Sequence, residues 1–210
     1  MDNNTSQLYE NSYSSSDLIN YIRKTDILRR IYPELYLQKF CYHTTYYHPE
    51  GAKAIRKSDC TIFDYTYGIH DTDEYLIQLG TVFDHTLAAL SESESTDPET
   101  NLCILFHDIG KPYTFKERID IKKQIKKLTY YEHEKVGGGL FKNLCKRFEF
   151  SSSFIEKCMF CIEEHMHAHK LSEMKQAKVD RIKQHKYFKI LEYIAHCDYY
   201  CRKDGNGVIH

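Results

Sequence analysis

The hydrophobic positions of this chain recur mainly at three- and four-residue steps, which is the period of amphipathic helices. Leu76, Leu79, Leu87 and Leu90 show this period, and no stretch of useful length alternates between apolar and polar residues as a half-buried strand would. The predicted helices run from Asp17 to a stop at Pro33, over 74–90, from Leu102 to Phe106, over about 131–149, from Ser153 to Met166, and over about 178–203 as one helix or a pair. The sequence therefore predicts an all-α fold class, a single helical bundle.

Capping signals support two of these helix starts. Asp71 with Glu74, and Ser153 with Glu156, have the spacing of a capping box, in which two side chains satisfy backbone N–H groups at the beginning of a helix. The acidic stretch 91–100, between two predicted helices, is expected to be a solvated loop.

The remaining segments lack a clean period. Residues 1–16 are rich in Ser and Asn and are predicted to form a disordered N-terminal tail. The helical domain is predicted over 17–210, with residues 34–72 mostly irregular and an irregular insertion at about 52–72. The basic stretch 113–129 is interpreted as a solvated surface loop or helix, because charge runs usually lie in solvent.

The composition supports one folded domain and excludes some functions. The chain has 210 residues, a length that suffices for one hydrophobic core, and 14% of its residues are aromatic. Lys plus Arg total 29 and Asp plus Glu total 30, so the net charge of −1 argues against bulk DNA binding or a role on an anionic membrane. No signal peptide and no apolar run of roughly 20 residues is seen, so we expect a cytoplasmic protein whose eight cysteines are free thiols.

The twelve histidines raise the question of metal binding, because imidazole is a common metal ligand. The titratable residues predicted to face the helical core are His85, His107, Asp108, His133, His165 and Asp198. A lone buried histidine is usually a hydrogen-bonded core residue, but such a set on separate helices is costly to bury unless it is paired or bound to metal. Mixed imidazole and carboxylate ligands suit a divalent transition metal (Mn, Fe, Co, Ni or Zn), with Mg²⁺ as a further alternative.

Four segments carry a resemblance to a known family: VFDHTLAAL (82–90), LCILFHDIGKP (102–112), YYEHEKVGG (130–138) and FCIEEHMHAH (160–169). Together with a late Asp198 they resemble the HD superfamily of metal-dependent phosphohydrolases, and most closely the HD domain of bacterial CCA-adding tRNA nucleotidyltransferases. The resemblance covers roughly residues 26–203. Nothing in the sequence resembles the nucleotidyltransferase head of those enzymes, so CCA addition is not predicted.

The resemblance implies roles for individual residues. His85, His107, Asp108 and Asp198 would bind the metal, which lowers the pKa of a bound water and polarises a phosphoryl oxygen. Asp108 would also orient that water, and Lys111 would offset the charge of the phosphate. His133 and His165 would either complete a second metal site or bind and protonate the leaving phosphate, and both alternatives stay open.

The implied activity is hydrolysis of a small phosphorylated substrate, a phosphomonoester or phosphodiester such as a nucleotide, a 2′,3′-cyclic nucleotide or an RNA end. Two alternatives stay open. A few relatives with this fold are di-iron oxygenases, for which His133 and His165 would supply additional ligands. The chain would otherwise be a non-catalytic metal-binding module that kept the fold.

Several further residues are left with two interpretations. His169 follows His165 by four positions, so it is either an extra ligand or substrate contact, or a surface residue. The pairs Cys158 with Cys161 and Cys197 with Cys201 have a spacing that suits structural zinc, but the same spacing is core spacing on a helix and no knuckle turn accompanies it.

Overall fold

The computed structural model describes residues 19–20, 33–40, 53–56, 68–70, 75–78, 81–120, 125–148 and 150–201. The predicted N-terminal tail and the predicted capping box at Asp71 and Glu74 lie outside these residues. Of the helix predicted from Asp17 to Pro33, only residues 19–20 are described before Pro33, and both are helical.

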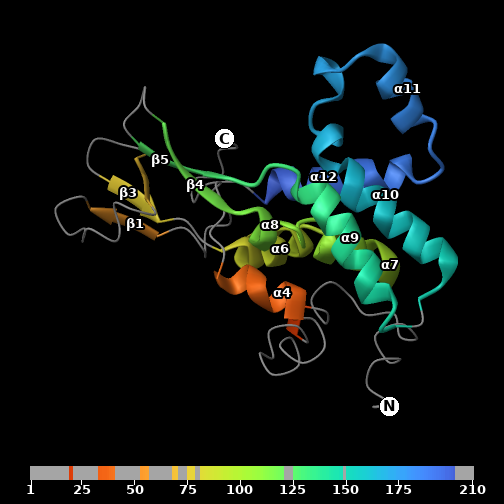
Figure 1. Cartoon of the computed structure of the whole chain (residues 1–210), viewed down its shortest axis with the longest axis horizontal. Coiled ribbons are helices and arrows are strands. Elements are labelled where there is room, and N and C mark those ends of the chain that lie inside the picture. The colour runs from red at the N-terminus through yellow and green to blue at the C-terminus, as the bar shows by residue number, and fades with distance from the viewer. Residues whose placement is uncertain are drawn as a thin grey trace.

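Helices form the core of the molecule, which confirms the predicted all-α class for the part that carries the buried residues. The longer helices are α6 (Val82–Ser91), α7 (Pro98–Phe106), α9 (His133–Cys145), α10 (Ser152–Ala168) and α12 (Phe188–Tyr200). Helix α10 packs against α7, α9 and α12, and α6 packs against α7 and α12 (Figure 1). The buried rings of Phe106, Phe141 and Phe154 fill the space between them. Among the helices of the described residues, none is long and apolar enough to cross a bilayer.

Shorter helices accompany the longer ones in the described part of the chain. They are α4 (Pro33–Leu37), η1 (Gln38–Phe40), α8 (Lys111–Thr114), η3 (Leu171–Glu173) and α11 (Gln176–Lys183). Pro33 begins α4 as well as marking the predicted stop, because proline fits the first position of a helix. The segment 178–203 is a pair of helices, α11 and α12, which is one of the two predicted alternatives.

Short strands are also present, although the sequence shows no strand pattern of useful length. Strands β1 (Lys53–Arg56), β3 (Tyr75–Gln78) and β2 (Gly68–His70) form an antiparallel sheet in the order β1-β3-β2. Strands β4 (Lys116–Asp120) and β5 (Ile125–Thr129) form an antiparallel hairpin. Figure 1 shows both groups of strands on the same side of the helices. Two of the strands lie within the predicted irregular insertion at 52–72, and the hairpin replaces the loop or helix predicted over 113–129.

The missed strands have a common physical cause. The stretch Tyr75–Gln78 is a short apolar run whose Leu76 fits a helical period as well as it fits a strand, so periodicity alone cannot decide between them. Strand β4 is almost entirely charged, so it lacks the alternating pattern of a half-buried strand. In both places the backbone pairs with a neighbouring strand, and this pairing decides the structure. No local sequence pattern shows such a pairing.

The starts of two helices also differ from the prediction. Helix α6 begins after Thr81 instead of at residue 74, and Thr81 and Asp84 form the capping box there. Helix α10 is capped by Ser151, whose hydroxyl accepts a hydrogen bond from the backbone N–H of Phe154, and not by Ser153. Helix α7 begins at Pro98, so the acidic loop is shorter than the predicted 91–100.

Glycines set the buried face of α9. Val136 is 37% exposed, and the buried face of α9 includes Gly137, Gly138 and Phe141. A Cβ atom on Gly110 would lie 2.0 Å from the carbonyl oxygen of His133, so the turn before α8 touches the backbone of α9. This close approach is open only to glycine, and it brings the first turn of α9 beside the end of α7.

Candidate metal centre

The six titratable residues that the sequence placed on core-facing positions meet at one point. They are His85 in α6, His107 and Asp108 at the end of α7, His133 at the first position of α9, His165 in α10 and Asp198 in α12. Each is at most 4% exposed. Five separate segments therefore direct imidazole or carboxylate groups into one buried polar cluster.

Asp108 lies at the centre of this cluster. Its Oδ2 atom lies 3.2 Å from Nε2 of His107 and 3.4 Å from Nε2 of His85. Its Oδ1 atom lies 3.3 Å from Nε2 of His133 and 3.5 Å from Nε2 of His165. One carboxylate thus bridges two groups of imidazoles, one on each of its oxygens.

Asp198 extends the first of these groups. Its Oδ1 atom lies 3.0 Å from Nε2 of His85, and its Oδ2 atom lies 2.5 Å from Nε2 of His169. His169, at the end of α10, is thus joined to the cluster through a carboxylate rather than exposed on the surface. His167, on the same helix, instead contacts Glu164 and Lys178 and lies outside the cluster.

Backbone carbonyls orient three of the imidazoles. The Nδ1 atoms of His107, His133 and His165 lie 2.6, 2.8 and 2.7 Å from the carbonyl oxygens of Ile104, Tyr130 and Ile162, respectively. A carbonyl oxygen only accepts, so each Nδ1 carries the proton and donates it. The Nε2 atom of each neutral ring then presents a lone pair to the cluster, which is the arrangement that metal-binding histidines usually have.

This orientation creates a specific electrostatic conflict between His133 and His165. Their Nε2 atoms lie only 3.0 Å apart, beside the Oδ1 atom of Asp108. Two lone pairs and a carboxylate oxygen at that separation repel one another unless a proton or a metal cation lies among them. In addition, the buried Nε2 atom of His107 makes no hydrogen bond within the described part of the chain.

The fourth imidazole has a different partner. The Nδ1 atom of His85 lies 3.5 Å from Sγ of Cys201, a buried thiol at the end of α12. The same sulfur lies 3.1 Å from the carbonyl oxygen of Asp198. Cys201 therefore supports one side of His85 while the other ring nitrogen faces the carboxylates.

Burial controls the charge states in the cluster. It lowers the pKa of His85 and of His165 to about 4 each, and their contacts with Asp198 and Asp108 offset only part of this effect. Burial alone would raise the pKa of Asp108, but His107 and Lys111 outweigh it and hold that pKa well below its usual range. At neutral pH His85 and His165 are thus neutral imidazoles and Asp108 is a carboxylate, the forms that bind metal. Burial would lower the pKa of His107 as well, but Asp108 and Asp198 outweigh it and raise that pKa above its usual value.

Lys111 contributes a positive charge to the same site. Its Nζ atom lies 2.6 Å from Oδ2 of Asp108, and the residue is only 7% exposed. The ammonium group also lies 5.6 Å from the centre of the Tyr130 ring. Lys111 is thus a buried lysine beside the central carboxylate, unlike an ordinary exposed lysine.

The donor set fits a divalent transition metal. Three groups of ligand atoms lie within 4.8 Å of one another: His85, His107 and Asp108; His85, Asp198 and Cys201; and Asp108, His133 and His165. Two of them share Asp108, so the cluster has ligands for one ion or for two. Imidazole nitrogens with carboxylate oxygens match the preference of such metals.

The sequence did not identify every contact of this cluster. It offered His169 with two interpretations, and the four-residue step from His165 was the signal for its position. Cys201 was considered only as half of a cysteine pair, because nothing in a sequence shows which histidine a thiol will face. Cys158 and Cys161 are buried free thiols and belong to none of the three candidate metal groups of the described residues.

The comparisons with known proteins yield one weak similarity. The chain is 29% identical over 115 residues to a protein named multifunctional CCA protein, from Pasteurella multocida (strain Pm70). The match covers 51% of this chain and 25% of that relative, so the chain spans about a quarter of the relative's length. No family model matches the sequence, and no solved structure matches it.

Proposed function

We propose that this chain is a metal-dependent phosphohydrolase of the HD type. The observation that carries the proposal is the pair of Nε2 lone pairs of His133 and His165, 3.0 Å apart beside Asp108 in a buried cluster. Such an arrangement is costly unless a proton or a metal cation lies between the nitrogens, so it supports metal binding more strongly than the mere presence of histidines. The similarity to a CCA protein over half of the chain supports the same family.

The residues divide into two groups of ligands around Asp108. His85, His107, Asp108 and Asp198 would hold one ion, and His133 and His165 would hold a second with the other oxygen of Asp108. When bound, a divalent ion supplies Lewis-acid chemistry, which polarises a phosphoryl oxygen and makes water a stronger nucleophile.

The protein's own groups would then position the reactants. Asp108 accepts a hydrogen bond from the attacking water and fixes its direction, while the Nζ atom of Lys111 approaches the phosphate oxygens. The water gives up one proton as its oxygen forms a bond to phosphorus, the bond to the leaving oxygen breaks, and the leaving oxygen takes up a proton. With one ion bound, His133 and His165 are available to bind the phosphate and to donate that proton.

The resemblance of the sequence motifs indicates the substrate class. We expect a phosphomonoester or phosphodiester, with nucleotides, 2′,3′-cyclic nucleotides and RNA ends as the first candidates. A cytoplasmic location fits such a substrate.

The test begins with the metal content of the purified full-length chain, measured by elemental analysis. Hydrolysis of 2′,3′-cyclic, 2′-, 3′- and 5′-nucleotides is then measured with added Mn²⁺, Co²⁺, Ni²⁺, Zn²⁺ or Mg²⁺. We expect Asp108→Ala and His85→Ala to reduce the rate by more than about 100-fold, because each loses a ligand. His167→Ala is the matched control on α10, since His167 lies outside the cluster. Wild-type rates in both ligand variants would refute the assignment.

A di-iron oxygenase is the second candidate function. It is favoured by a second group of possible ligands, Asp108, His133 and His165, which would hold a second ion. Iron at two ions per chain, with oxygen consumed and no phosphate released, would support this function over hydrolysis. A protein without metal and without either activity would instead be a binding module.

A further inference from the structure

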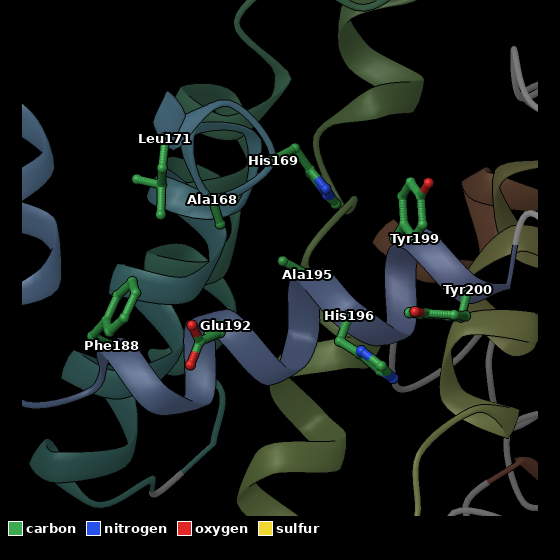
Figure 2. Close-up of a pocket in the computed structure, with 9 residues that line it drawn as sticks. All are labelled: Ala168, His169, Leu171, Phe188, Glu192, Ala195, His196, Tyr199 and Tyr200. Atoms are coloured by element: carbon green, nitrogen blue, oxygen red, sulfur yellow. The ribbon is translucent and has the colours of Figure 1, made fainter. Parts of the chain in front are cut away.

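A groove lies beside the metal centre, between the C-terminal end of α10 and helix α12. It encloses about 310 Å³, which is the lower end of the range for small-molecule sites. The residues that line the groove include His169, Leu171, Phe188, Glu192, His196 and Tyr199. Figure 2 shows Leu171 and Phe188 at one end of the groove, and His169 and Tyr199 at the other.

His169 connects the groove to the metal centre. Its ring lines the groove, and its Nε2 atom lies 2.5 Å from Oδ2 of Asp198. The other oxygen of Asp198 lies 3.0 Å from His85. One end of the groove is therefore separated from Asp198, a candidate metal ligand, by the side chain of His169 alone.

The walls of the groove suit a flat, partly polar ring. Phe188, His196 and Tyr199 contribute three aromatic rings from one helix, and the rigid helix holds them without a large entropic cost on binding. Tyr199 is 43% exposed, so part of its side chain is accessible to a ligand. Glu192 adds a carboxylate. Its Oε2 atom accepts a hydrogen bond from Lys189 at 3.0 Å, and its other oxygen can accept one from a ring that carries amino or N–H groups.

We propose that this groove binds the planar ring of the phosphorylated substrate, a nucleobase, while the phosphate lies at the metal centre. This inference rests on the proposed function, since it uses the cluster as the phosphate site. The phosphate lies at the His169 end, because that end is joined to the cluster through Asp198. Stacking on Tyr199 supplies the affinity for the base, and it is tolerant of which base is present.

The test compares two ligands that differ by the base alone and cannot be hydrolysed: the phosphonate analogues of AMP and of ribose 5-phosphate. Their dissociation constants are measured by calorimetry on the full chain with Mn²⁺. We expect the wild-type protein to bind the AMP analogue at least about fivefold more tightly, the low end of what stacking of a base on an aromatic side chain contributes. Tyr199→Ala should lose this preference, and Tyr199→Phe, which keeps the ring, should retain it.

Tyr113→Ala is the matched control, because Tyr113 is also an exposed tyrosine (49%) and does not line the groove. It should keep the wild-type preference. Equal affinity of the two analogues for the wild-type protein would overturn the proposal, and so would a preference that survives in Tyr199→Ala.

Hydrolysis of bis-p-nitrophenyl phosphate, which has no nucleobase, tests the proposed function separately. If no ester is cleaved but the preference depends on Tyr199, the phosphohydrolase assignment fails and the groove stands as a nucleotide-binding site. If the ester is cleaved and the wild-type protein shows no preference, the groove proposal fails alone.

Discussion

At the scale of single residues, the candidate metal centre is supported by the orientation of the histidine rings. Carbonyl oxygens hold the protonated Nδ1 atoms of His107, His133 and His165, so the Nε2 atoms turn inward. His85 alone faces a thiol, at 3.5 Å, where the other rings face a carbonyl. Because it is held by this weaker partner, His85 depends on the side chain of Cys201 rather than on the backbone.

This difference leads to a prediction for Cys201→Ala. Without the sulfur, His85 loses the contact to its Nδ1 atom, so we expect metal affinity to fall by about tenfold, the low end for such supporting contacts. A metal titration followed by calorimetry measures it. Cys197→Ala, one turn earlier in α12, removes an equally buried thiol that belongs to none of the candidate metal groups and should keep the affinity. Equal losses in the two variants would contradict a specific role for Cys201.

At the scale of elements, the sequence could predict the helices but not all of their ends. The His-Asp doublet could be placed at the end of α7 because an apolar run leads into it and Gly110 and Pro112 follow. The start of α6 could not be located, because the short apolar run at Tyr75–Gln78 fits both periods. The contact between Asp198 and His169 depends on how α10 and α12 pack, and therefore on the whole fold.

The start of α10 offers a direct test of such an end. Ser151→Ala should lower the free energy of unfolding by about 1 kcal/mol, because the Ser151 hydroxyl accepts a hydrogen bond from the N–H of Phe154. Ser153→Ala, at the cap position predicted from the sequence, should lower the free energy of unfolding by less. Urea unfolding of both variants measures the difference, and a larger loss in Ser153→Ala would favour the cap predicted from the sequence.

The close approach of Gly110 to α9 leads to a prediction that links an element to the site. In Gly110→Ala the new methyl group would lie 2.0 Å from the carbonyl oxygen of His133, so α9 must move. We expect a loss of about 1–3 kcal/mol in the free energy of unfolding, with weaker metal binding because His133 moves too. Urea unfolding and a metal titration measure the two effects.

Gly139→Ala is the control on the same helix, because a Cβ atom there meets nothing within 4 Å. It should stabilise the protein by roughly 0.5–1 kcal/mol, since alanine favours a helix interior more than glycine does. A Gly110→Ala protein as stable as the wild type, and with unchanged metal affinity, would show that this contact does not position His133.

At the scale of the whole molecule, the cluster joins segments that are distant in the sequence. Helices α6, α9, α10 and α12 and the end of α7 each contribute a candidate ligand, so a bound ion would link all of them. The unfolded chain cannot hold these ligands together, and an ion that binds only the folded state stabilises it. At a free metal concentration one hundred times the dissociation constant, the gain is about 2.7 kcal/mol.

We therefore expect the melting temperature to rise with added Mn²⁺ and to fall when EDTA removes the ion. Thermal unfolding at several metal concentrations measures this change, and the size of the shift gives an estimate of the affinity. Asp108→Ala should abolish the dependence on metal, because its carboxylate lies between both groups of imidazoles. His167→Ala should retain it, since His167 is on α10 but contacts Glu164 instead of the cluster. Identical melting temperatures with Mn²⁺ and with EDTA would contradict a metal that bridges the helices, even if the protein bound metal elsewhere.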